Sequence, residues 1–208
     1  MASLGNVCII DHGLCNLDSI ARAVEECGAT PHVTKRAEDL RSCDRLIIPG
    51  VGAFGKAMEN LKSDGMDEAI RAERERRQLP VLGICLGMQL LAEASEEGGE
   101  FRGLGLIPGR VVRLKRAAPR ERVPHVGWNE IDIVANHPLL AGLGSGSNFY
   151  FVHSYHLSCA QNENVLAFTP YCGRFASVVA KDDVMGVQFH PEKSQKAGFQ
   201  LLRNFLTF

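Results

Sequence analysis

Short strand-like runs alternate with helical stripes over the first 95 residues of the chain. We expect strands at 7–10, 31–34, 45–48 and 81–84, and helices at 17–27, 54–61 and 66–78. Regular alternation of strands and helices predicts a parallel sheet with helices on both faces. Such sheets bind ligands at the carboxyl ends of their strands, so the turns that follow the strands are the first places to look for chemistry.

The second half of the chain has a different pattern. Strand-like segments follow one another without a strong amphipathic helix between them, at 111–114, 130–134, 148–153, 165–169, 176–180 and 184–189. This pattern predicts a mixed or antiparallel extension of the sheet. A closing helix is expected at 197–208. No repeat or linker interrupts the sequence, so we expect a single α/β domain over residues 1–208, with a mostly parallel central sheet.

The last apolar run of the first half ends at Cys85, and a glycine stands two residues away on either side. Met88, Leu91 and Ala92 then recur at helical spacing, so the segment predicts a strand, a sharp turn and a helix. A nucleophile at such a turn is strained and lies at the positive end of a helix. The N–H of Leu86 would be placed to stabilise an oxyanion. A buried structural cysteine is the alternative, and the paired glycines favour the nucleophile.

A base for this nucleophile is expected at His190. This residue ends the segment 184–189 and is followed by Pro191 and Glu192. A histidine that takes the thiol proton, and a carboxylate that orients its ring, would complete a triad with Cys85. The alternative is a surface His-Pro turn with a solvated glutamate.

Residues 49–52 form a glycine loop, Pro-Gly-Val-Gly, directly after a predicted strand. Such a loop can turn a backbone N–H, here that of Gly52, toward the thiol and supply a second oxyanion donor. A phosphate-binding loop is the rival interpretation. It is disfavoured because the Lys-Ser/Thr pair of a P-loop and the spacing of a dinucleotide fingerprint are both missing.

Composition argues against several other classes of function. The chain has 208 residues, seven cysteines and a net charge of −1. This charge argues weakly against nucleic acid as the main ligand, and no apolar run approaches the roughly 18 residues of a membrane span. The cysteines are scattered, which fits a reduced, cytoplasmic protein better than a disulfide framework or a zinc site. We expect no metal and no signal peptide.

Three segments together resemble those of class I, triad-type glutamine amidotransferases. They are Gly83-Ile-Cys-Leu-Gly-Met-Gln89, Pro49-Gly-Val-Gly52 and Gln188-Phe-His-Pro-Glu-Lys-Ser194. The segments 11–19, 124–129 and 150–155 are similar to signatures of one branch, the glutaminase subunits of imidazole glycerol phosphate synthase, an enzyme of histidine biosynthesis. The resemblance extends over essentially the whole chain.

This resemblance implies a reaction and a partner. Cys85 would attack the side-chain amide of L-glutamine, His190 would protonate the departing ammonia, and water would release glutamate from a glutamyl thioester. Ammonia would pass to a (β/α)₈-barrel cyclase subunit, in a heterodimer that makes imidazole glycerol phosphate and AICAR. No cofactor is implied. The residues implied to bind the substrate are Gln89, Glu97, His153, Ser154 and Tyr155, with Glu97 at the α-amino group.

Two positions depart from the usual pattern of this family. His12 stands where tyrosine is common and Cys15 where glycine is common, at the rim of the sheet, where pocket shape or partner docking could differ. Trp128, the only tryptophan, is expected in the core or at a subunit interface. Three alternative functions stay open: the same glutaminase feeding a different synthase, such as one that amidates surface sugars, a stand-alone cysteine hydrolase, and a binding protein without catalysis.

Overall fold

Parallel strands form the first part of a large central sheet. The computed structural model describes residues 4–208 of the chain. The strands of this sheet are β1 (Asn6–Ile10), β2 (Thr30–Thr34), β3 (Arg45–Ile48), β4 (Val81–Ile84), β9 (Asp132–Ile133), β12 (Val165–Thr169), β13 (Phe175–Lys181) and β14 (Val184–Val187). Their order is β2-β1-β3-β4-β14-β13-β12-β9. Neighbours from β2 to β14 are parallel, and those from β14 to β9 are antiparallel. The predicted mostly parallel sheet with antiparallel later strands is confirmed.

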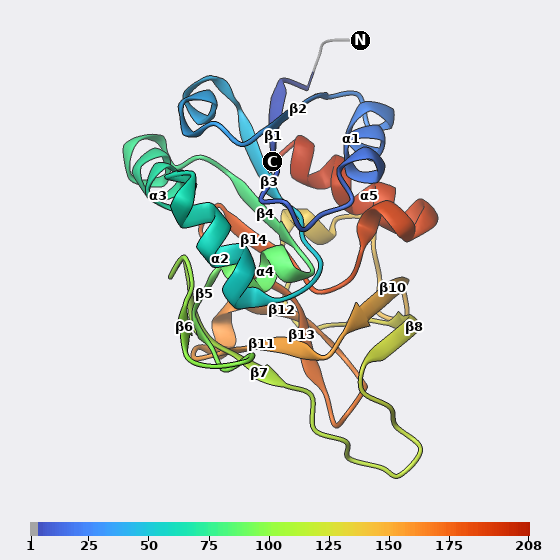
Figure 1. The fold of residues 1–208 in the computed structure, drawn as a ribbon. Helices are drawn as coiled ribbons and strands as arrows, with labels where there is room; N and C mark the ends of the chain where they lie inside the picture. The colour runs from blue at the N-terminus through green and yellow to red at the C-terminus, as the bar shows by residue number, and fades with distance from the viewer. Residues whose placement is uncertain (1–3) are drawn as a thin grey trace.

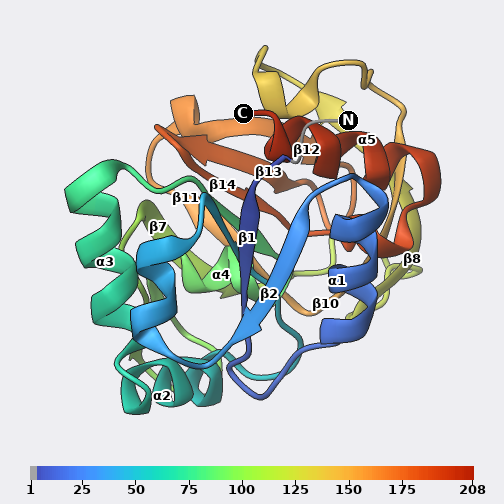
Figure 2. The same cartoon turned by 90° about the horizontal axis from the view of Figure 1, so that it is seen from above.

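Helices cover both faces of this sheet (Figures 1 and 2). On one face lie α1 (Leu17–Glu26) and α5 (Gln195–Leu206), and on the other lie α2 (Phe54–Ser63), α3 (Met66–Arg77) and α4 (Leu86–Leu90). Strand β1 shows the reason: Val7 and Ile9 pack with α1 and α5, whereas Cys8 and Ile10 pack with α2 and α3. Successive side chains of a strand point to opposite faces, so an uninterrupted apolar strand needs cover on both sides.

Two smaller sheets, which the sequence did not predict, adjoin the central one. The first contains β11 (Tyr155–Cys159), β7 (Ile107–Arg113), β5 (Ala92–Ser95) and β6 (Phe101–Arg102), in that order. The second pairs β8 (His125–Glu130) with β10 (Asn148–His153). The strand expected at 130–134 is therefore divided between the end of β8 and β9. Short 3₁₀ helices occupy Ala37–Ser42, Pro138–Leu140, Asn162–Asn164 and Pro191–Lys193.

Helix α4 is shorter than the helical stripe in the sequence predicted. It ends at Leu90, and Ala92 begins strand β5 instead of continuing the helix. The carbonyl of Leu91 accepts the N–H groups of Leu106 and Ile107, at 2.9 and 3.0 Å. These contacts from a distant segment replace the next helical hydrogen bonds and divert the chain into the four-stranded sheet. None of the helices within residues 4–208 combines the length and the apolar composition that crossing a membrane requires.

Candidate active site

Cys85 lies between β4 and α4 with a strained backbone. Its φ of 55° and ψ of −107° fall outside the regions that ordinary residues favour. The flanking glycines are required by close packing. A Cβ on Gly87 would lie 1.6 Å from the carbonyl oxygen of Ile48, and one on Gly83 would lie 2.6 Å from the carbonyl oxygen of Gly87. The predicted sharp turn from strand to helix is therefore confirmed.

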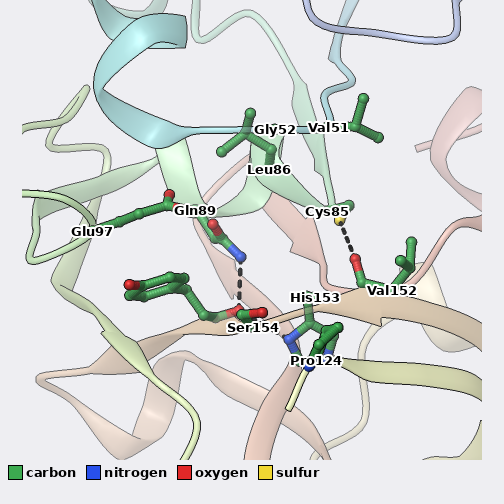
Figure 3. Close-up of a pocket in the computed structure, with 11 residues that line it drawn as sticks. Val51, Gly52, Cys85, Leu86, Gln89, Glu97, Pro124, Val152, His153 and Ser154 are labelled. Carbon is green, nitrogen blue, oxygen red and sulfur yellow. Dashed lines mark hydrogen bonds between the residues drawn. The ribbon is translucent and has the colours of Figure 1, made fainter.

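The thiol of Cys85 contacts groups from distant segments. Its Sγ donates toward the carbonyl oxygen of Val152 at 3.8 Å (Figure 3), and Nε2 of Gln188 donates toward Sγ, also at 3.8 Å. Sequence reasoning gave Gln188 no role. Gln188 is a polar residue directly after the apolar strand β14, and this position could have indicated a role. A buried amide needs hydrogen-bond partners, so such a side chain is expected to contact other polar groups.

His190 and Glu192 form a buried pair. Nδ1 of His190 lies 2.9 Å from Oε1 of Glu192, and the two side chains are only 4% and 5% exposed. Burial favours the neutral ring, but interactions with the Cys85 thiol and with Glu192 outweigh it and raise the pKa of His190 to about 10. Because Nδ1 faces the carboxylate, Nε2 is the atom left to exchange a proton with the thiol. It is buried and has no other hydrogen-bond partner in the described part of the chain.

A pocket of about 270 Å³ opens beside the thiol. In Figure 3, Gln89 lies between Cys85 and Glu97 along this pocket. The pocket brings together the predicted oxyanion and substrate residues with the nucleophile, and its lining is Val51, Gly52, Cys85, Leu86, Gln89, Glu97, Pro124, Val152, His153, Ser154 and Tyr155. His190 and Glu192 instead line a second, smaller cavity of about 20 Å³.

Hydrogen bonds hold the polar side chains of the pocket in place. Nε2 of Gln89 donates to the carbonyl oxygen of Tyr155 at 2.8 Å and to Oε1 of Gln188 at 3.2 Å. Oε2 of Glu97 accepts the backbone N–H of Phe54 at 2.9 Å, at the start of helix α2. This contact satisfies one of the orphan N–H groups of the helix and places a negative charge at its positive end.

His153 is a neutral part of the pocket wall. Its Nδ1 donates to the carbonyl oxygen of Tyr155 at 2.9 Å, so its Nε2, 3.1 Å from Nδ1 of His125, acts as the acceptor. Burial lowers the pKa of His153 to about 3 and that of His125 to about 4. Within residues 4–208, no group of three or more His, Cys, Asp or Glu side chains is arranged to hold a metal ion.

Two backbone N–H groups at the loop of residues 49–52 are already bonded to carbonyl oxygens. The N–H of Leu86 donates to the carbonyl oxygen of Gly50 at 3.3 Å, and the N–H of Val51 donates to the carbonyl oxygen of Leu14 at 2.7 Å. Gly52 lines the pocket with a φ of 96°. The Leu86 N–H can serve the reaction only after the Gly50 carbonyl turns away, and the roles of Leu86 and Gly52 stay predictions.

Comparisons with known proteins show the family of the chain. A family model described as glutamine amidotransferase class-I matches residues 8–207. Imidazole glycerol phosphate synthase subunit HisH 1 of Campylobacter jejuni subsp. jejuni serotype O:23/36 is 44% identical over 199 residues, which cover 96% of this chain and 98% of that protein. Imidazole glycerol phosphate synthase subunit HisH of Sulfurimonas denitrificans is 45% identical over 204 residues, covering 97% and 98%.

Solved structures of more distant proteins share the fold. A protein from Thermoplasma acidophilum described as a putative GMP synthase subunit superposes with a TM-score of 0.73 at 20% identity, covering 97% of this chain and 92% of that one. PurLQS from Thermotoga maritima gives a TM-score of 0.74 at 17% identity, covering 97% of each chain. At these identities the likeness concerns the fold alone.

Proposed function

Because the chain belongs to the class-I glutamine amidotransferase family, and within it to the HisH glutaminase subunits of imidazole glycerol phosphate synthase of histidine biosynthesis, we propose that Cys85, His190 and Glu192 carry out its chemistry. The observation that carries this proposal is a strained cysteine at a pocket, backed by a buried histidine–carboxylate pair. Cys85 attacks the side-chain amide carbon of glutamine while His190 holds the proton of its thiol. His190 then protonates the departing ammonia, and a glutamyl thioester remains on Cys85.

Hydrolysis of the thioester follows the same path in reverse. His190 takes a proton from water, which attacks the thioester carbonyl, and glutamate leaves as the proton returns to the cysteine sulfur. Glu192 holds the ring with a proton on Nδ1 and stabilises the imidazolium. The N–H groups of Leu86 and Gly52 stabilise the oxyanion once the Gly50 carbonyl has turned away.

The pocket suits the length and the charges of glutamine. With the side-chain amide at Cys85, the α-ammonium group lies at the Glu97 carboxylate, and Gln89 contacts the substrate between them. A hydrogen bond between a carboxylate and an ammonium group is stronger than one between neutral groups. The contact with Glu97 therefore favours an amino acid over an amide that lacks the α-ammonium group. The opposite wall consists of His153, Ser154 and Tyr155.

Exposed apolar side chains beside the pocket suit the (β/α)₈-barrel cyclase as a partner. Trp128 is 49% exposed and Val126 57%, so Trp128 does not lie in the core. Trp128 pairs with Tyr150 across the β8–β10 ribbon, and Val126 pairs with Val152, whose carbonyl contacts the thiol. Large exposed apolar groups mark interfaces, and tryptophan is often an anchor there. We place the cyclase on this ribbon and on Val51, which is 41% exposed.

The small cavity behind the triad suits the exit of ammonia. Its volume of about 20 Å³ has room for one molecule the size of water, and residues of its wall include Asn16, Val51, His190, Glu192 and Lys193. Nζ of Lys193 lies 5.9 Å from the centre of the Tyr150 ring, so this cavity adjoins the proposed docking ribbon. Ammonia leaving here reaches the partner without crossing bulk water.

The test is glutamate release from glutamine by the purified chain, measured alone and then with the histidine-pathway cyclase and its nucleotide ligand. We expect strong stimulation by the cyclase and a loss on the order of 10⁴-fold or more in Cys85→Ala. Activity that depends on Cys85 but not on the cyclase would point to another synthase. Fast hydrolysis of other small amides or esters without a partner would favour a stand-alone hydrolase, and no activity in any mixture would favour a binding protein.

A further inference from the structure

His12 lies outside the triad, buried behind the loop at residues 49–52. It is only 2% exposed, and its Nε2 lies 2.7 Å from the carbonyl oxygen of Pro49. A carbonyl can only accept, so the ring carries its proton on Nε2 and donates it to Pro49. Burial lowers the pKa of His12, which keeps the ring neutral. Nδ1 is also buried and finds no partner among residues 4–208, so the contact with Pro49 is what orients the ring.

A second hydrogen bond joins the loop at residues 49–52 to the segment that contains His12, on the other side of Gly50. The carbonyl oxygen of Leu14 accepts the N–H of Val51 at 2.7 Å. The fit between the loops is tight, because a Cβ on Gly50 would lie 2.9 Å from Nε2 of His12. The peptide groups before and after Gly50 are therefore both bonded to the segment that contains His12.

This segment is itself anchored. Nδ2 of Asn60, on helix α2, donates to the carbonyl oxygen of His12 at 2.7 Å, and Oδ1 of Asp11 accepts the N–H of Gly13 at 2.8 Å. A peptide group bonded to an anchored segment cannot rotate without breaking those bonds. The carbonyl of Gly50 therefore stays in place, where it accepts a hydrogen bond from the N–H of Leu86.

We propose that His12 is a positioning residue that latches the loop at residues 49–52 in its resting orientation, and so keeps glutamine hydrolysis slow until a partner moves the loop. The inference rests on the proposed function, because it concerns the oxyanion donors of that reaction. The latch consists of the His12 Nε2–H bond to Pro49 together with the Val51 N–H bond to Leu14. Removing the His12 bond favours the orientation in which the Leu86 N–H is free.

The variant His12→Phe tests the latch, since phenylalanine fills a similar volume but cannot donate to Pro49. We expect glutamate release by the isolated chain to rise roughly five- to tenfold, the effect of one net hydrogen bond, and stimulation by the cyclase to fall by the same factor. His12→Gln keeps a donor and should stay close to the unmodified chain. His137→Phe, at a half-buried histidine stacked on Phe208, is the matched control and should change neither rate.

Amide hydrogen exchange separates this latch from the proposed function. The N–H groups of Val51 and Leu86 should exchange faster in His12→Phe than in the unmodified chain, while that of Leu46 in β3 stays protected. Unchanged exchange at Val51 and Leu86 would overturn the latch, as would basal release at or below the unmodified level in a variant that unfolds cooperatively. If His12→Phe does not fold, Asn60→Ala, which loosens the same segment, takes its place with the same two readouts.

Failure of the proposed function would look different. In that case neither the unmodified chain nor the variant would release glutamate with the cyclase present, yet the exchange comparison would still decide whether His12 holds the loop.

Discussion

The turn at Cys85 and the loop at residues 49–52 form two walls of one pocket and are held in different ways. Both follow neighbouring parallel strands, β4 and β3. The strained turn is locked by backbone packing, because Gly87 leaves no room for a single added atom beside Ile48. The loop is held by hydrogen bonds to other loops. Close packing admits one geometry, whereas hydrogen bonds can be exchanged. The nucleophile is therefore preformed, whereas the loop that occupies the N–H of Leu86 is adjustable.

After Cys85→Ala, the largest expected effect on the preformed side comes from Glu192→Gln. The amide keeps the size of the side chain but cannot stabilise the imidazolium or fix the same tautomer, so we expect kcat for glutamine hydrolysis with the cyclase to fall roughly 10²–10⁴-fold. Steady-state glutamate release measures this loss. A loss below about threefold would remove Glu192 from the triad.

The same variant has a pH signature. In the unmodified chain the raised pKa keeps His190 protonated up to pH about 10, so activity that needs the imidazolium persists below that pH and is lost as the pH rises through it. Without the carboxylate the pKa of His190 falls, and the alkaline limb of kcat/KM should move to lower pH. An alkaline limb at the same pH in both proteins would contradict this assignment.

The packing of the turn predicts the next effect. Gly87→Ala places a methyl group where the Ile48 carbonyl already lies, and backbone on both sides prevents relaxation. We expect a loss of about 3 kcal/mol or more in the free energy of unfolding, measured by urea denaturation. Gly144→Ala is the control, because no atom lies within 4 Å of its added Cβ. Equal stability of the two variants would show that the turn is not locked by packing.

Glu97 links the two walls, because it lines the pocket and also binds the N–H of Phe54, shortly after the loop. In Glu97→Gln the amide oxygen can still accept this N–H, but the charge for the α-ammonium group is lost. We expect KM for glutamine to rise roughly tenfold or more, with a smaller change in kcat, as for the loss of a charged hydrogen bond. Glu163→Gln, at an exposed glutamate of a 3₁₀ helix, is the matched control. An unchanged KM would place the α-ammonium group elsewhere.

The smallest expected effect is on binding of the cyclase, the partner that we expect to move the loop at residues 49–52. Trp128→Ala should weaken binding of the cyclase about tenfold, that is by about 1–2 kcal/mol, since it removes an exposed aromatic anchor. Titration calorimetry of the two subunits measures it, and Trp128→Phe, which keeps most of the ring area, should lose less. Undiminished affinity in Trp128→Ala would move the docking surface away from β8.

The first half of the fold could be predicted because the apolar runs of β1, β3 and β4 are buried on both faces and the helices between the strands have apolar stripes. The later strands were harder. Ala92–Ser95 has no strand-like composition, and it forms β5 only because β7 and β6 pair with it. His125–Glu130 likewise becomes a strand by pairing with β10. Such pairings depend on segments far apart in the chain, which local patterns do not report.

The sequence by itself determined the strained turn at Cys85, since paired glycines between a strand and a helix have few other uses. It also placed His190 and Glu192 at the end of a strand that proved to be a neighbour of β4. Only the tertiary structure decided which groups surround the thiol. The Val152 carbonyl and the Gln188 amide come from two distant segments. A backbone N–H such as that of Leu86 can bind any acceptor that the fold brings close, and here that acceptor is Gly50.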